Sequence, residues 1–142
     1  MKYVIDASVA AKWCLPAASE PLLREANELL RQQVNGEVQF VVPDLFWAEI
    51  ANVLWKAVRV GRCGRDSAEM SLHLLKRQRL PTFSSESLVE QALAIALTFE
   101  RSAYDSIYVA LALETGAQLI TADEKLANAL AARMPVKWLG AL

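Results

Sequence analysis

The chain has 142 residues, which at roughly 150 residues per domain predicts a single domain over 1–142. Hydrophobic residues make up 54% and charged residues 22%, a composition that excludes a disordered chain and suits one with an apolar core. Fifteen Lys and Arg against sixteen Asp and Glu give a net charge of −1, which excludes an overall basic nucleic-acid coat but not a local basic patch.

Two cysteines and one histidine are too few for a four-ligand zinc site built from those residues, and sparse thiols suit a reducing cytosol. The longest wholly apolar stretch, 107–113, is far shorter than the ~18 residues of a membrane span. Asp6 interrupts the only candidate signal region. We therefore expect a cytoplasmic protein without a membrane partner, whose catalysis uses carboxylates, hydroxyls, Lys or Arg.

Apolar periodicity and turn residues predict short strands alternating with helices. Ser19 and Ser87 are predicted helix N-caps, and Gly61 and Gly116 end helices. In chain order we predict a strand over 3–5, helices over 7–13 and 19–34, a strand over 39–42, helices over 44–60 and 65–78, a strand over 82–84, helices over 87–99 and 104–115, a strand over 118–121, a helix over 124–133 and a strand over 136–139.

The predicted strands are apolar on both faces, which is typical of strands covered by helices on both sides. We therefore expect an α/β fold: a central, mostly parallel sheet of about five short strands, flanked by helices in a three-layer sandwich. Ligand sites in such sheets lie at the carboxyl ends of the strands, so polar residues at those ends are candidate site residues.

Two acidic residues stand at such ends. Asp6 directly follows the first predicted strand, and Asp123 follows the fourth. Each has a structural alternative: Asp6 suits a helix N-cap, and Thr121 with Glu124 suits a capping box that puts Asp123 in the first helical turn. Taken singly, both residues are explained by these structural roles.

Asp105 is more informative, although Ser102 with Asp105 also fits a capping box. At about 100° per residue, the predicted solvent face of its helix contains Ser106, Ala110 and Glu114, and Asp105 points to the opposite side. A carboxylate on a buried face needs a partner, for which a metal ion is one candidate.

Glu49 borders the polar stripe of its helix, where a solvated surface glutamate is the default interpretation. If the strand ends converge, however, three or four carboxylates meet without His or Cys. Like charges that close require a cation, and all-oxygen ligation favours Mg²⁺ or Mn²⁺ over zinc. The usual chemistry of such a pocket is phosphoryl transfer.

Four segments in this order resemble the motifs of the PIN-domain family, and more narrowly its VapC-type toxin ribonucleases. They are 3–8 (YVIDAS), 43–52 (PDLFWAEIAN), 102–112 (SAYDSIYVALA) and 119–123 (LITAD). The resemblance covers essentially the whole chain. It implies a Mg²⁺-dependent endoribonuclease, in which Mn²⁺ substitutes, that forms a homodimer and is inhibited by a small cognate antitoxin.

The resemblance also assigns roles. It makes Asp6, Asp105 and Asp123 metal ligands, Glu49 the group that orients or deprotonates the attacking water, and Ser8 and Thr121 accessory hydroxyls that hold carboxylates or waters in place. Glu49 thereby changes from a default surface residue to an expected site residue.

Two surfaces are candidates for partners. Residues 56–79 contain seven basic and two acidic side chains, and we name Arg59, Arg62 and Arg65 as candidate RNA contacts; solvated helix faces are an equal alternative. The helix over 44–60 is apolar around most of its circumference, including Trp47, Leu54 and Trp55. Part of that surface suggests a dimer or antitoxin contact, the alternative being burial under the neighbouring helix.

Two other functions remain open at this point: a PIN-type RNA-processing nuclease without an antitoxin, and a non-catalytic α/β module with an acidic metal pocket, such as a phospho-receiver. A receiver needs an Asp after its third strand, where this chain has Ser84 and Ser85.

Overall fold

The protein is described from a computed structural model, which describes the backbone of residues 1–142 and all side chains except that of Ser19. Strands alternate with helices in the predicted order. The elements are β1 (Lys2–Ile5), α1 (Ala7–Cys14), η1 (Ala17–Ser19), α2 (Leu23–Val34), β2 (Gln39–Pro43), α3 (Leu45–Arg59), α4 (Arg65–Lys76), β3 (Thr82–Phe83), η2 (Glu86–Leu88), α5 (Val89–Phe99), α6 (Ala103–Thr115), β4 (Gln118–Thr121), α7 (Glu124–Leu130), β5 (Val136–Trp138) and η3 (Leu139–Ala141), where η denotes a 3₁₀ helix.

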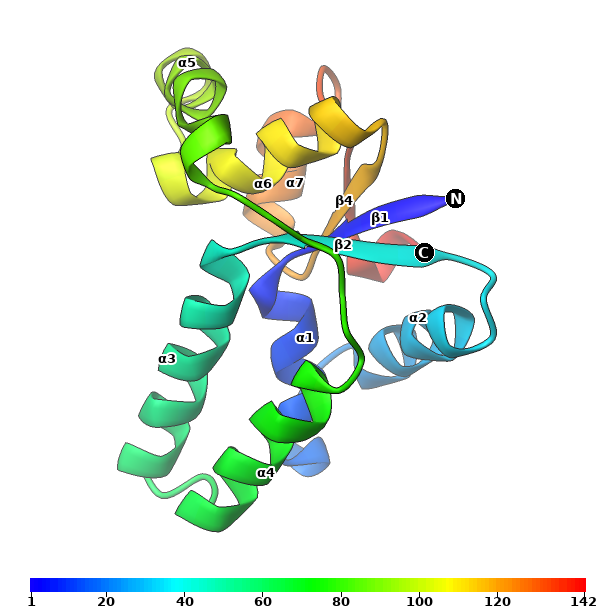
Figure 1. The fold of residues 1–142 in the computed structure, drawn as a ribbon, viewed down its shortest axis with the longest axis vertical. Helices are drawn as coiled ribbons and strands as arrows, with labels where there is room; N and C mark the ends of the chain where they lie inside the picture. Colours follow the sequence, from blue (N-terminus) through cyan, green and yellow to red (C-terminus); the bar gives the residue numbers. More distant parts are fainter.

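The five strands form one parallel sheet in the order β3-β2-β1-β4-β5. Figure 1 shows α1 to α4 on one side of this sheet and α5 to α7 on the other. The expected three-layer α/β fold is therefore confirmed. The chain adds strands on one side of β1, then returns through α5 and α6 to place β4 on the other side, so the strand order reverses between β1 and β4.

Burial of both sheet faces explains why the central strands are continuously apolar. Val4 and Ile5 of β1 are fully buried, and Ile5 lies in register with the equally buried Ile120 of β4. Such strands have no solvated face, so polar residues are found only where they end.

Two predicted helix caps are wrong. Ser19 ends η1, and α2 begins only at Leu23, after Leu22 takes a left-handed φ of 57°; the Ser19 side chain lies outside the described part. Ser87 lies inside η2, where its hydroxyl donates to the Ser84 carbonyl. Serine hydroxyls bond local backbone in turns as readily as at helix starts, so the sequence does not separate the two.

The predicted solvent face of α6 is also wrong. Ser106 and Ala110 are fully buried, and of the three residues named for that face only Glu114 is exposed. The reason is tertiary: α6 packs against α5 as well as against the sheet. As a result, α6 is buried on all sides from 106 to 112.

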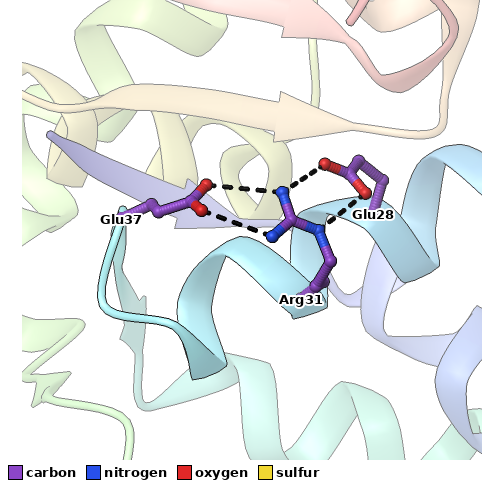
Figure 2. A network of polar contacts seen from close by, with 3 residues as sticks. All are labelled: Glu28, Arg31 and Glu37. Carbon is purple, nitrogen blue, oxygen red and sulfur yellow. Dashed lines mark hydrogen bonds and ion pairs between the residues drawn. The ribbon is translucent and has the colours of Figure 1, made fainter.

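Some charged side chains on the outer surface form ion pairs with one another. Figure 2 shows Arg31 of α2 between Glu28, 2.7 Å away on the same helix, and Glu37, 3.3 Å away in the turn that leads to β2. All three side chains are exposed, so this network adds little to stability. In the described chain, no helix is long and apolar enough to cross a membrane.

Candidate functional site

The four acidic residues singled out in the sequence line one pocket of about 420 Å³ at the carboxyl edge of the sheet. The lining residues are Asp6, Ala7, Ser8, Ala48, Glu49, Asn52, Val53, Asp105 and Asp123. The pocket lies where the strand order reverses, the usual position of ligand sites in open parallel sheets.

Four separate elements deliver these carboxylates. Asp6 directly follows β1, and Asp123 follows β4 and precedes α7. Glu49 lies in the second turn of α3, and Asp105 lies in the first turn of α6. Asp6, Glu49 and Asp105 are partly buried, whereas Asp123 is exposed at the rim.

Two hydroxyls hold Asp6. Ser8 and Thr121 each donate to Asp6 Oδ2 at 2.7 Å. The same hydroxyls accept backbone N–H groups from the end of β4: Ser8 from Ala122 at 3.1 Å and Thr121 from Asp123 at 3.0 Å. These bonds fasten the end of β1 to the end of β4 and orient the first carboxylate of the pocket.

These contacts decide between the structural alternatives. The Asp6 side chain makes no capping bond to α1. Thr121 does not form the capping box with Glu124: its hydroxyl accepts the N–H of Asp123 and donates to Asp6. Asp123 itself caps α7 by accepting the N–H of Leu126.

Asp105 lines the pocket, although the solvent face from which its inward orientation was predicted is itself buried. Ser102 caps α6 by accepting the backbone N–H of Asp105 at 3.1 Å, which sets the start of the helix and leaves the Asp105 carboxylate at the pocket wall. The capping role and the pocket role therefore coexist in this segment.

Glu49 is not an ordinary surface glutamate. It lines the pocket, and its Oε1 accepts a hydrogen bond from the hydroxyl of Tyr108, which comes from α6 on the other side of the sheet. Sequence analysis missed Tyr108. The available signal was a tyrosine within the apolar stretch 107–113, because a buried hydroxyl needs a partner.

The pocket is electrostatically unfavourable for negative charge. Burial raises the pKa of Asp6, Glu49 and Asp105 above its ordinary value. Mutual repulsion adds to this: Asp105 raises the pKa of Asp6, and Asp123 raises the pKa of Asp105. Hydrogen bonds from Thr121 and Ser8 offset part of the effect on the pKa of Asp6.

The donor set fits a hard divalent cation, because it consists of carboxylate and hydroxyl oxygens whose negative charge is offset only in part, by Arg101 near Asp105. Among the described side chains, no three Asp, Glu, His or Cys residues are already arranged as ligands of one ion.

The candidate RNA contacts lie outside the acidic pocket. Arg59 and Arg62 line a neighbouring hollow of about 530 Å³, which shares Val53 with the pocket. Arg62 forms an ion pair with Glu20 at 2.8 Å. Arg65 pairs with Glu69 and lines a different groove.

That groove, of about 340 Å³, lies between α3 and α4 and is mainly apolar. Its lining residues are Ala51, Leu54, Trp55, Val58, Arg65, Ala68, Glu69 and Leu72. Of the α3 side chains expected to meet a partner, Leu54 is buried, and Trp47 packs under Lys76 and donates to Thr82. Trp55 is 54% exposed and remains available.

Comparison with known sequences gives consistent matches over most of the chain. A family model described as the PIN domain matches residues 3–130. "Ribonuclease VapC3" of Pyrobaculum aerophilum is 34% identical over 130 residues, covering 90% of this chain and 94% of that protein. "Ribonuclease VapC9" of Mycobacterium tuberculosis is 29% identical over 119 residues, covering 84% and 92%.

Solved structures share the fold at low sequence identity. PAE2754 from Pyrobaculum aerophilum aligns with a TM-score of 0.72 at 20% identity, over 99% of this chain and 85% of that one. VapBC2 from Rickettsia felis, bound to a promoter DNA fragment, aligns with a TM-score of 0.67 at 11% identity, over 97% and 98%. A toxin–antitoxin complex from Klebsiella pneumoniae aligns with a TM-score of 0.62 at 18% identity, over 95% of each chain.

The raised carboxyl pKa values predict how metal-free stability depends on pH. Because the folded protein holds these protons more tightly than the unfolded chain, their contribution to the free energy of unfolding is largest below the unfolded pKa values and is lost as pH rises through the folded ones. In EDTA, mild acidification from neutral pH should therefore raise the melting temperature before general acid unfolding begins.

Asp105→Asn removes one of these charges with little change in shape. It should raise the metal-free melting temperature at neutral pH by a few degrees and flatten its pH dependence. Glu114→Gln, an exposed carboxylate on the same helix, controls for the loss of one negative charge. A lower melting temperature for Asp105→Asn than for wild type in EDTA at neutral pH would show that this carboxylate is net stabilising.

Proposed function

This chain belongs to the PIN-domain family, and from that premise we propose that it is a divalent-metal-dependent endoribonuclease acting as the toxin of a toxin–antitoxin pair. The observation that carries the proposal is the convergence of Asp6, Glu49, Asp105 and Asp123 in one pocket with hydroxyls but no His or Cys. Relatives that bear the name ribonuclease align over most of the chain.

Asp6, Asp105 and Asp123 would hold Mg²⁺, for which Mn²⁺ substitutes. When bound, the cation activates water and neutralises charge on the phosphodiester. Ser8 and Thr121 fix the orientation of Asp6 through their 2.7 Å hydrogen bonds. Asp123 also caps α7, so its carboxylate is anchored by the backbone at the pocket rim.

Glu49 is the general base in this proposal. Its carboxylate accepts the proton of the water that attacks phosphorus, while the bond from phosphorus to the leaving oxygen breaks. Burial raises the pKa of Glu49, which makes the carboxylate a stronger proton acceptor than an exposed glutamate. The raised value also brings its titration closer to neutral pH.

We place the RNA strand along α3. Asn52 and Val53 line the acidic pocket, and Val53, Lys56 and Arg59 line the adjoining hollow, so one edge of the helix runs from the acids to the cations. Lys56 and Arg59 have no ion-pair partner among the described side chains. They are therefore free to contact RNA phosphates next to the acidic pocket.

Trp55 adds a surface suited to bases. It is exposed, and the Arg59 guanidinium lies 5.3 Å from its ring centroid. Exposed aromatic rings and guanidinium planes stack with unpaired bases, which favours single-stranded RNA. Arg62 also contacts the RNA in this proposal, although it forms an ion pair with Glu20. Arg65 has weaker support as an RNA contact, because it pairs with Glu69 in the other groove.

A small cognate antitoxin and a second copy of the chain are the proposed protein partners, with the cytoplasm as their location. The molecule has two separate apolar surfaces for them: the groove between α3 and α4, and a stripe on α5 formed by the exposed Val89, Leu93 and Leu97. A small antitoxin gene next to this one would favour the toxin over an RNA-processing nuclease of the same family.

RNA cleavage should require Mg²⁺ or Mn²⁺ and stop in EDTA.

Glu49→Gln should keep the fold and lower the cleavage rate by about 10²–10⁴-fold, the usual range for loss of a general base. Glu90→Gln, an exposed glutamate on α5, is the matched control. Activity that persists after tightly bound metal is removed, or near wild-type turnover by folded Glu49→Gln, would contradict the mechanism.

Replacing Lys56 and Arg59 together by Gln should weaken RNA binding and make it less dependent on salt. At about 0.7 per phosphate contact for single strands, the slope of log K against log salt should fall by roughly 1.4. Binding can be followed by fluorescence anisotropy in the Glu49→Gln background, with Arg24→Gln on α2 as the control. An unchanged slope would place the RNA on another surface.

A further inference from the structure

Tyr108 is a buried polar group to which the mechanism above gives no role. It is 2% exposed and lies in the part of α6 that is buried on all sides. A phenol in such a place normally reaches a hydrogen-bond partner, since an unpaired buried hydroxyl is costly. The partner here is not a neighbouring backbone group of α6 but a carboxylate of the candidate active site.

The Tyr108 hydroxyl links α6 to α3. It donates its proton to Glu49 Oε1 in the second turn of α3, and the backbone of Ala7, next to Asp6, lowers the pKa of the phenol by a smaller favourable interaction. The hydrogen bond to Glu49 gives the phenol a fixed place against α3. Its position is set from within the core rather than by solvent.

The chemistry of this contact allows only one direction of donation. Burial, together with the negative charges of Asp6 and Glu49, raises the pKa of Tyr108 far above its ordinary value. The phenol therefore keeps its proton and acts as a donor. It does not compete with Glu49 for the proton that leaves water.

Among the described side chains, Tyr108 is the only one that donates a hydrogen bond to Glu49. Asp6 has a different pair of donors, Ser8 and Thr121. A glutamate has three side-chain torsions, and an unheld one on the rim of a pocket samples several rotamers. Fixing one carboxylate oxygen restricts Glu49 and leaves the other oxygen to accept a proton.

We propose that Tyr108 is a positioning residue, whose hydroxyl fixes the Glu49 carboxylate for proton transfer during RNA cleavage. The inference rests on the nuclease function proposed above. In the step concerned, the proton of the attacking water passes to Glu49, and Tyr108 neither gains nor loses a proton. Tyr108 acts on the reaction only through Glu49.

The first test is Tyr108→Phe, which removes one oxygen atom and leaves the ring. Loss of a partner that orients an active-site ligand costs about 10–100-fold in activity, and we expect a loss of this size in kcat. The KM for a single-stranded RNA should change less than twofold, because the RNA contacts lie on α3. Tyr3→Phe is the control, since Tyr3 lines a separate pocket of the molecule.

A double-mutant cycle separates positioning from a general structural effect. In single-turnover assays, Tyr108→Phe should cost little further rate in a Glu49→Gln background, because the general base is already lost. The proposal is wrong if Tyr108→Phe lowers the cleavage rate by the same factor in the wild-type and Glu49→Gln backgrounds. It is also wrong if Tyr108→Phe cleaves RNA as fast as wild type. A wild-type protein that cleaves no RNA with any divalent metal would instead overturn the function itself.

Replacement of Tyr108 by 4-aminophenylalanine provides a second variant that keeps an N–H donor at the same place. The amino variant should recover most of the cleavage rate that Tyr108→Phe loses. It can also be compared with wild type if Tyr108→Phe does not fold. Thermal melts of every variant establish that rates refer to folded protein. Failure of the folded amino variant to exceed Phe in rate would also contradict the proposal.

Discussion

Repulsion among carboxylates at one edge of a parallel sheet is the constraint on which the rest of the structure depends. Parallel strands end at the same edge, so Asp6 after β1 and Asp123 after β4 are brought together by the fold itself. Asp105 and Glu49 add two more charges from either side of the sheet. Burial and mutual repulsion raise the pKa of three of these groups, even with Arg101 acting on Asp105, so ionisation of the cluster is costly for the protein alone.

Hydrogen bonds from hydroxyl groups hold the carboxylates of the pocket in place against their mutual repulsion. Ser8 and Thr121 hold Asp6, and Tyr108 holds Glu49, so the two carboxylates have separate donors. Thr121 and Tyr108 are buried, which keeps water from competing for these bonds. The burial of the middle of α6, from 106 to 112, therefore serves the site, because it places a phenol from one layer of the sandwich against a glutamate from the other.

Much of this could be predicted from the sequence, because local patterns and strand ends determine it. The order of strands and helices and the four acids follow from apolar runs and from the motifs around them. What escaped prediction depends on contacts between distant segments: α6 is packed between α5 and the sheet, Thr121 bonds Asp6 rather than capping α7, and Tyr108 reaches Glu49. No spacing rule within one helix contains that information.

The pairing of β1 with β4 has a consequence for the protein during its own synthesis. The N–H of Asp6 bonds the carbonyl of Ile120, and the Asp6 carboxylate accepts hydrogen bonds from the nearby Ser8 and from Thr121, so part of what orients the first acid comes from residues more than a hundred positions later. A nascent chain that has not yet released β4 from the ribosome has neither the strand nor Asp123. The acidic pocket is therefore complete only after most of the chain has been synthesised, because Thr121 and Asp123 come from its C-terminal part.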